Sequence, residues 1–167
     1  NNRNNKIFDF FKKVFPDAIV IYTSSINAEI LKYTTNAFLS IKVSFANEIY
    51  SICNEVGSDY SKVIEMLLMD KRIGKSHWKV PGPDGDFGYG GHCFPKDLSE
   101  LIFFTDKNKT PNNVLKAAKR TNDKVRSNKD WEGMEGRAVR DQYYAQAGQS
   151  LLSGGSSYYS TQKGMSA

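Results

Sequence analysis

The chain has 167 residues, of which 40% are hydrophobic and 25% are charged, and its net charge is +5. This length and balance exclude a disordered or fibrous chain and fit one globular domain, with little room for a dinucleotide site beside a second substrate site. No apolar run reaches the roughly 18 residues of a membrane span, and the first residues lack the apolar run of a secretion signal, so we expect a cytoplasmic protein with no membrane partner.

The first predicted elements are a helix and a short strand. Apolar residues recur at helical spacing over residues 6–15, and Pro16 ends that pattern before the β-branched run of residues 18–22. A helix followed by a strand is half of an α/β repeat, which needs further strands to pair with. The opening of the chain therefore predicts a remnant of an α/β domain.

A single helix over residues 26–56 is the dominant predicted element. Neither glycine nor proline interrupts it, and Gly57 follows its end. Apolar residues form two stripes along it, so we expect neighbouring helices or a second subunit to cover most of its sides. The first stripe comprises Leu31, Thr34, Phe38, Ile41, Phe45, Ile49, Ile52 and Val56, and the second comprises Lys32, Asn36, Leu39, Val43, Ala46, Tyr50 and Cys53.

The polar start of the second stripe is the first candidate for function. Lys32 and Asn36 lie four residues apart near the predicted helix N-terminus, so their side chains share one face. The pattern alone leaves two interpretations open, an exposed first turn or a functional pair. Further along this stripe, Cys53 is predicted to be a buried thiol of the core.

Shorter helices are predicted over residues 60–69, from Pro95 onward, and over residues 111–126. Residues 70–92, rich in glycine and proline, form either an ordered or a flexible loop between the first two. Residues 107–129 hold eight basic side chains and one acid, which favours a solvated helix face. A nucleic-acid partner is not expected, because this stretch lacks aromatic residues for stacking.

The sharpest local signal is the glycine-rich sequence that leads to Cys93. Gly88, Gly90 and Gly91 let backbone N–H groups approach a phosphate or a sugar. A thiol that opens a helix beside a lysine is favoured as the nucleophilic thiolate. We interpret Cys93 as a candidate nucleophile, with an unreactive loop cysteine as the alternative. The spacing of the two cysteines does not fit zinc, so no metal site is predicted.

Three motifs, at residues 28–38, 70–74 and 88–97, closely resemble the UDP-glucose 6-dehydrogenase family of UDP-glucose and GDP-mannose dehydrogenases, and occur in the same order. The likeness covers roughly residues 6–130 and implies a mainly α fold built on the long helix. Residues 1–25 would be the remnant of the NAD-binding α/β domain, residues 26–130 the helical central and dimerisation domain, and residues 131–167 a tail rich in Gly, Ser and Tyr.

The resemblance implies a two-step, NAD-dependent oxidation of a nucleotide sugar, through a thiohemiacetal and a thioester on Cys93, in a homodimer formed by the helix over 26–56. Lys32 and Asn36 match residues that stabilise the oxyanion, and Asp97 matches an aspartate that handles protons. Arg72 matches an arginine that reaches the partner subunit's substrate. The remaining matches are Lys96 for the cofactor and, for the substrate, Phe87, Gly88, Tyr89, Gly90 and Gly91.

The sequence also departs from the family. No G-x-G-x-x-G follows a predicted strand, so the NAD phosphate site is missing and we expect the chain alone to be inactive. His92 stands where a small residue is common, and residues 81–86 lengthen the loop. The alternatives are a non-catalytic dimerisation module derived from this family and, from the basic stretch, a nucleic-acid-binding helical protein.

Overall fold

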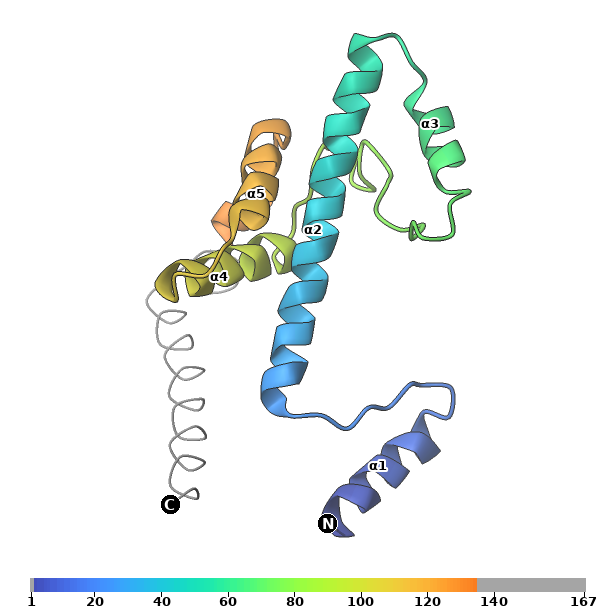
Figure 1. The fold of residues 1–167 in the computed structure, drawn as a ribbon, viewed down its shortest axis with the longest axis vertical. Helices are drawn as coiled ribbons and strands as arrows, with labels where there is room; N and C mark the ends of the chain where they lie inside the picture. The colour runs from blue at the N-terminus through green and yellow to red at the C-terminus, as the bar shows by residue number, and fades with distance from the viewer. Residues whose placement is uncertain (1, 135–167) are drawn as a thin grey trace. The chain divides into compact units, whose positions relative to one another are not determined.

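The computed structural model describes residues 2–134, and these residues are helical or irregular, with no strand (Figure 1). The mainly α fold is therefore confirmed. Most of the predicted tail, residues 135–167, lies outside the described residues. The helices are α1 (Asn2–Val14), α2 (Ser25–Glu55), α3 (Tyr60–Leu67), α4 (Cys93–Lys107), α5 (Asn113–Val125) and the 3₁₀ helix η1 (Asp130–Gly133).

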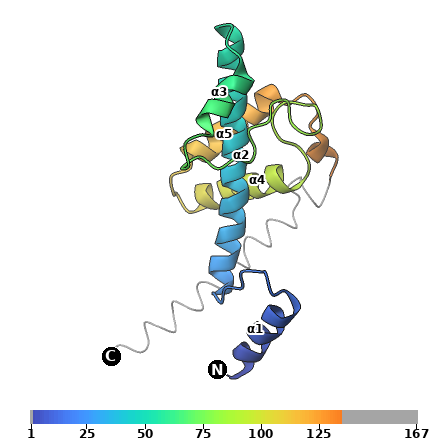
Figure 2. The same ribbon diagram turned by 90° about the vertical axis from the view of Figure 1, so that its right-hand side faces the viewer.

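Helix α2 is the axis of the unit formed by residues 33 onward. Its 31 residues span about 45 Å at the rise of an α-helix. Helix α3 lies on one side of α2, and the pair α4 and α5 lies on the other, as the two perpendicular views agree (Figures 1 and 2). Helices of the same chain therefore cover α2 on two of its sides.

Two apolar clusters fill the spaces on these two sides of α2. On the α4 and α5 side, the buried residues come from α2, the glycine loop, α4 and α5. On the α3 side, they come from α2, α3 and the loop that follows α3. The clusters are Ala37, Val43, Tyr89, Leu98 and Ala118 on the first side, and Ala46, Cys53, Tyr60, Ile64 and Trp78 on the second.

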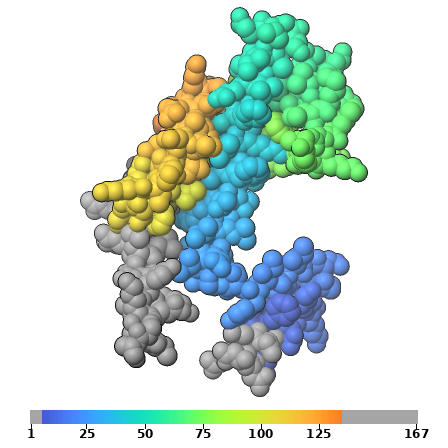
Figure 3. Space-filling model, viewed as in Figure 1, coloured from blue at the N-terminus to red at the C-terminus, as the bar shows by residue number. Residues whose placement is uncertain are grey.

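The described residues cover the first predicted stripe of α2 only in part, where Ile41 and Ile49 pack against the two clusters. Phe38 is 61% exposed, Phe45 48% and Ile52 56%, whereas Val43 and Cys53 of the second stripe are buried. The space-filling view shows α2 flanked by α4 and α5 on one side and by α3 on the other, with part of its surface open between them (Figure 3). Neighbouring elements of the described chain thus cover two sides of this helix, and its covering by a second subunit stays a prediction.

The loop between α3 and α4 is ordered by side-chain hydrogen bonds. The Tyr60 hydroxyl donates to the backbone oxygen of Trp78 at 2.6 Å, and the Trp78 indole N–H donates to Gly74 at 2.8 Å. At the start of α3, Asp59 accepts hydrogen bonds from the amides of Ser61 and Lys62, as an N-cap residue does. These contacts favour the ordered interpretation of the loop.

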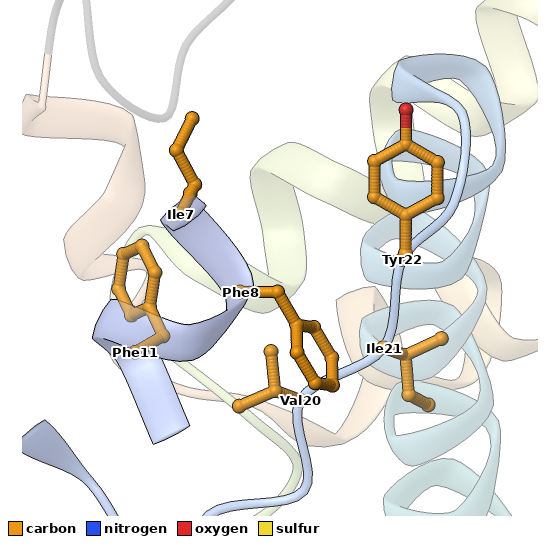
Figure 4. A pocket seen from close by; sticks show the side chains of 6 residues that line it. All are labelled: Ile7, Phe8, Phe11, Val20, Ile21 and Tyr22. Carbon is orange, nitrogen blue, oxygen red and sulfur yellow. The ribbon is translucent and has the colours of Figure 1, made fainter. Parts of the chain in front are cut away.

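Residues 1–32 form a second compact unit, described here by itself. The predicted helix is present as α1, but the strand predicted over residues 18–22 is absent, because residues 19–24 are irregular. A strand is defined by ladder hydrogen bonds to a neighbouring strand, and none lies within the described residues. Figure 4 shows the apolar cavity of about 330 Å³ between α1 and this segment, lined by Ile7, Phe8, Phe11, Val20, Ile21 and Tyr22.

None of the helices in residues 2–134 combines the length and the apolar character that a bilayer crossing requires.

Candidate functional site

Cys93 is the first residue of α4, and its side chain is exposed. As predicted, Pro95 lies in the first turn of this helix, where a missing N–H removes no helical hydrogen bond. Lys96 and Asp97 follow at spacings of three and four and therefore share a face with the cysteine. Cys53 is buried, which confirms its prediction as a core thiol.

Asp97 joins α4 to α2 through a buried carboxylate. Its relative exposure is 0%, and its Oδ2 accepts a hydrogen bond from the amide nitrogen of Asn36 at 2.5 Å. Its Oδ1 pairs with the ammonium of Lys96, which also lies 5.9 Å from the ring centre of Tyr33. Because a buried charge is tolerated only when it is paired and hydrogen-bonded, this arrangement fixes the carboxylate in place.

Of the residues predicted to act together, the structure thus joins Asn36, Lys96 and Asp97 by direct contacts. Lys32 lies one helical turn before Asn36 on α2, and its residue is exposed. Arg72 lies in the loop after α3 with its side chain 88% exposed, where it holds the Asp70 carboxylate at 2.5 Å. Among the contacts of the described residues, Arg72 pairs with Asp70 and makes no bond to the loop before Cys93.

The glycine loop before Cys93 is held by two buried asparagines that the sequence did not single out. The N–H of Gly88 donates to Asn47 Oδ1 at 3.2 Å, and the N–H of Tyr89 donates to Asn122 Oδ1 at 2.7 Å. Asn122 also donates to the backbone oxygen of Tyr89 at 3.0 Å. Gly88 has a φ of +68°, and a Cβ there would overlap the Asn122 amide. Glycine is therefore required here for close packing against α5.

The end of the loop is held by Asp130 of η1. Both of its carboxylate oxygens lie 3.0 Å from the N–H of Gly91, which donates to them. A Cβ on Gly90 would lie 2.6 Å from Asp130 Oδ1 and 2.7 Å from Cζ of Arg126. Several amides of the loop are thus engaged by the chain's own side chains, so phosphate binding by this loop stays a prediction.

Arg126, placed by the sequence in a basic and solvated helix face, is a buried cation instead. Its side chain is 2% exposed, and its guanidinium lies 2.7 Å from Asp84 and 3.5 Å from Asp86. It lies 3.8 Å from Asp130, and it donates to the backbone oxygen of Phe87 at 3.5 Å. These bonds tie both ends of the glycine loop to the end of α5. Composition could not reveal the pairs with Asp84 and Asp86, because these two carboxylates lie far from Arg126 in sequence.

Of the residues predicted to contact substrate, Tyr89 has a buried side chain and Phe87 a partly buried one. Tyr89 is 6% exposed, and burial, with a smaller contribution from the charge of Asp123, raises the pKa of its hydroxyl above the ordinary value. The ring of Phe87 lies 5.6 Å from that of Tyr50 on α2. Both aromatic side chains therefore anchor the loop to the core.

Asp86 makes the loop sensitive to acid. The amide of Asn128 is the main cause that lowers the pKa of Asp86 to about 2, and the hydroxyl of Ser127 and the amide of Phe87 add to it. A carboxyl whose pKa is depressed in the folded state stabilises that state above its unfolded pKa of about 4, and the stabilisation is lost as the pH falls through the folded value. The window is therefore about pH 4 to about pH 2.

We predict that Asp86→Asn flattens the loss of stability in this acid window, measured as urea midpoints at successive pH values. The amide cannot be protonated, so the contribution of this side chain disappears from the pH dependence. The control is Asp17→Asn, at an exposed aspartate with no ion pair among the described residues. A slope for Asp86→Asn equal to that of the parent would contradict the prediction.

Comparison with known proteins places these residues in a family. Residues 26–124 match the model of the central domain of the UDP-glucose/GDP-mannose dehydrogenase family. The chain is 41% identical over 109 residues to the UDP-glucose 6-dehydrogenase TuaD of Bacillus subtilis (strain 168), which covers 65% of this chain and 23% of that protein. It is 47% identical over 88 residues to UDP-glucose 6-dehydrogenase YwqF of the same strain, covering 52% and 19%.

A third relative is the UDP-glucose 6-dehydrogenase of Rickettsia bellii (strain RML369-C), 32% identical over 127 residues, which are 73% of this chain and 28% of that protein. The chain thus spans less than a third of the length of these relatives. The matched range includes Asn36, Cys93 and Asp97 together with the elements that hold them. The chain belongs to the UDP-glucose/GDP-mannose dehydrogenase family, whose central domain it carries over residues 26–124.

Proposed function

We propose that this chain supplies the central domain of a nucleotide-sugar 6-dehydrogenase, with Cys93 as its nucleophile. The observation that carries the proposal is an exposed sulfur at the start of α4, one turn before a buried carboxylate that is tied to α2 by Asn36. The substrate class follows from the relatives, which are named UDP-glucose 6-dehydrogenases.

The chemistry proposed for these residues is the addition of the Cys93 thiolate to an aldehyde carbon of the sugar. A carbon–sulfur bond forms while an electron pair of the carbonyl moves to its oxygen. An ammonium and an amide near that oxyanion would stabilise it by their charge and dipole, and Lys32 and Asn36 are the residues proposed for this role. Asp97, held by Lys96 and Asn36, keeps the amide of Asn36 in one orientation and is the proposed group for proton handling.

NAD is the oxidant that the family implies, but residues 2–134 do not fit its phosphates. A dinucleotide phosphate is held where a strand runs through a glycine-rich turn into a helix, and the described residues contain no strand. The glycine loop before α4 donates its Gly88 and Gly91 amides to Asn47 and Asp130. We therefore assign the hydride transfer to parts of the enzyme other than residues 2–134, and cofactor contact by Lys96 remains a prediction.

The exposed stripe on α2 supports a second proposed role, homodimerisation through this helix. Phe38, Phe45 and Ile52 lie on one stripe and are all at least 48% exposed, and a contiguous apolar surface of this kind is typical of interaction sites. A non-catalytic dimerisation module would need this stripe alone. It would have no use for the fixed loop and the exposed sulfur, which is why we favour the catalytic proposal.

The proposed function predicts that UDP-glucose slows the alkylation of Cys93 by iodoacetamide several-fold. A bound nucleotide sugar would cover the sulfur, and free glucose, which lacks the nucleotide, is the comparison ligand and should protect less. The measurement is mass spectrometry of the peptide that contains Cys93, with Cys93→Ser as the unlabelled control and buried Cys53 as an internal reference. Equal rates with and without UDP-glucose, up to saturating concentrations, would sink the proposal.

A further inference from the structure

The start of α4 places an imidazole beside the candidate nucleophile. Nε2 of His92 lies 3.5 Å from Sγ of Cys93, and Nδ1 lies 3.9 Å from it. Both residues are exposed. A thiol is a weak donor, and the unprotonated nitrogen of a neutral imidazole is an acceptor. These distances therefore allow a proton to pass between the two side chains.

His92 occupies the N-cap position of α4, yet its side chain does not cap the helix. An N-cap side chain usually accepts a hydrogen bond from one of the first helical amides, as Asp59 does for α3. The imidazole of His92 makes no such bond. Only its backbone oxygen serves the helix, accepting from the amide of Lys96 at 3.2 Å. The ring is consequently directed to the sulfur and not to the helix end.

The charged groups around the pair are already matched with one another. Lys96 and Asp97, which follow on the same face of α4, form an ion pair. Asp130 of η1 lies 3.8 Å from Arg126 of α5. On the α2 side, the neutral amide of Asn36 faces Asp97. Among the described contacts, the imidazole is thus the proton acceptor that meets the sulfur directly.

We propose that His92 is the proton acceptor of Cys93, so that the two residues form a Cys–His nucleophile. In the proposed step, the proton on Sγ moves to a nitrogen of the imidazole, and the freed sulfur electron pair forms the bond to the aldehyde carbon. The carbonyl electron pair moves to the oxygen, and no oxidant is needed. The thiolate is further stabilised by the N-terminus of α4. The identity of the electrophile rests on the proposed function, whereas the proton transfer does not.

The test is the rate at which iodoacetamide alkylates Cys93 in the full chain, followed from about pH 5 to about pH 9 by peptide mass. His92→Gln is expected to slow the reaction about tenfold near neutral pH, since a positioned base contributes at least that much. It should also remove the limb of the rate profile between about pH 5 and pH 8, where histidine side chains change charge.

The matched control is His77→Gln, which alters the other of the chain's two histidines. The ring of His77 packs 5.8 Å from that of Phe94 and has no role in the proposed transfer, so this variant should keep the rate and profile of the parent. Cys53 is buried and should stay unmodified in every variant, which reports that the fold is intact.

Superimposable profiles for the parent and His92→Gln, with both proteins folded, would overturn the proposal. Should His92→Gln fail to fold, the profile of the parent decides, because a histidine limb supports the pair and its absence overturns it. The outcome is separable from the proposed function. If His92→Gln is alkylated more slowly but UDP-glucose does not protect Cys93, the Cys–His pair stands and the proposed dehydrogenase function is refuted. If UDP-glucose protects Cys93 but His92→Gln reacts like the parent, the proposed function stands and the pair is refuted.

Discussion

Arg126→Gln is expected to lower the free energy of unfolding by about 2–3 kcal/mol, because it removes a buried cation and its charge-assisted hydrogen bonds to carboxylates that are partly exposed. The guanidinium is 2% exposed and holds Asp84 and Asp86 together with the backbone of the glycine loop. Without it, those carboxylates face each other with no cation between them. Urea unfolding followed by circular dichroism measures the loss.

The same change should loosen the loop that carries the cysteine. The amide of Gly91, held by Asp130, is expected to exchange with deuterium faster in Arg126→Gln than in the parent, because local opening costs less. Arg120→Gln, at an exposed arginine on the same helix, is the control and should change stability by no more than about 0.5 kcal/mol. Similar losses in the two variants would show that burial of Arg126 has no energetic weight.

Leu98→Ala is the second large effect, with an expected loss of about 2–5 kcal/mol from a cavity in the core. Leu98 is 1% exposed and packs with Ala37 of α2, Tyr89 of the loop and Ala118 of α5. No other side chain can fill the space it leaves, since its neighbours belong to different elements that are each fixed by their own hydrogen bonds. The measurement is again urea unfolding.

Val114→Ala provides the matched control, because this side chain is 63% exposed on α5. Its removal opens no cavity and should cost no more than about 0.5 kcal/mol. Leu98→Met, which conserves volume, should recover most of the lost stability. A loss of under about 1 kcal/mol for Leu98→Ala would mean that the core relaxes around the site.

The helices could be predicted from the sequence because they depend on local signals. Periodicity gave α2 within one residue at each end, and Gly57 and Pro16 marked the ends of helical patterns. The thiol of Cys53 could be assigned to the core from its position on an apolar stripe. The strand over 18–22 was wrong, because a strand depends on a partner that local pattern cannot supply.

The contacts that hold the candidate site could not be predicted, since they join residues far apart in sequence. Asn47 meets Gly88 across 41 positions, and Asn122 meets Tyr89 across 33. An isolated asparagine in a helix carries no sign of its partner. The burial of Arg126 could not be predicted either, because the residues around it in the sequence are basic and indicate a solvated face.

Hydropathy alone identifies only some of the α2 positions that turn inward. The buried positions include Ser40, Ser44 and Asn47, whose hydroxyls and amide bond the backbone of Asn36, Ala118 and Gly88. Small polar side chains let the loop and α5 approach the helix closely. Phe38 and Ile52, two large apolar side chains, are left on the outer face.

The exposed apolar side chains of α2 have a practical consequence for handling the molecule. Polar replacements at Phe38 and Ile52 leave the internal packing unchanged, since both lie outside the two buried clusters, whereas the ring of Phe45 packs 6.2 Å from that of buried Trp78. Solubility engineering at Phe38 and Ile52 would therefore separate the tendency of the chain to associate from its folding energy, two properties that a hydrophobicity profile merges into one.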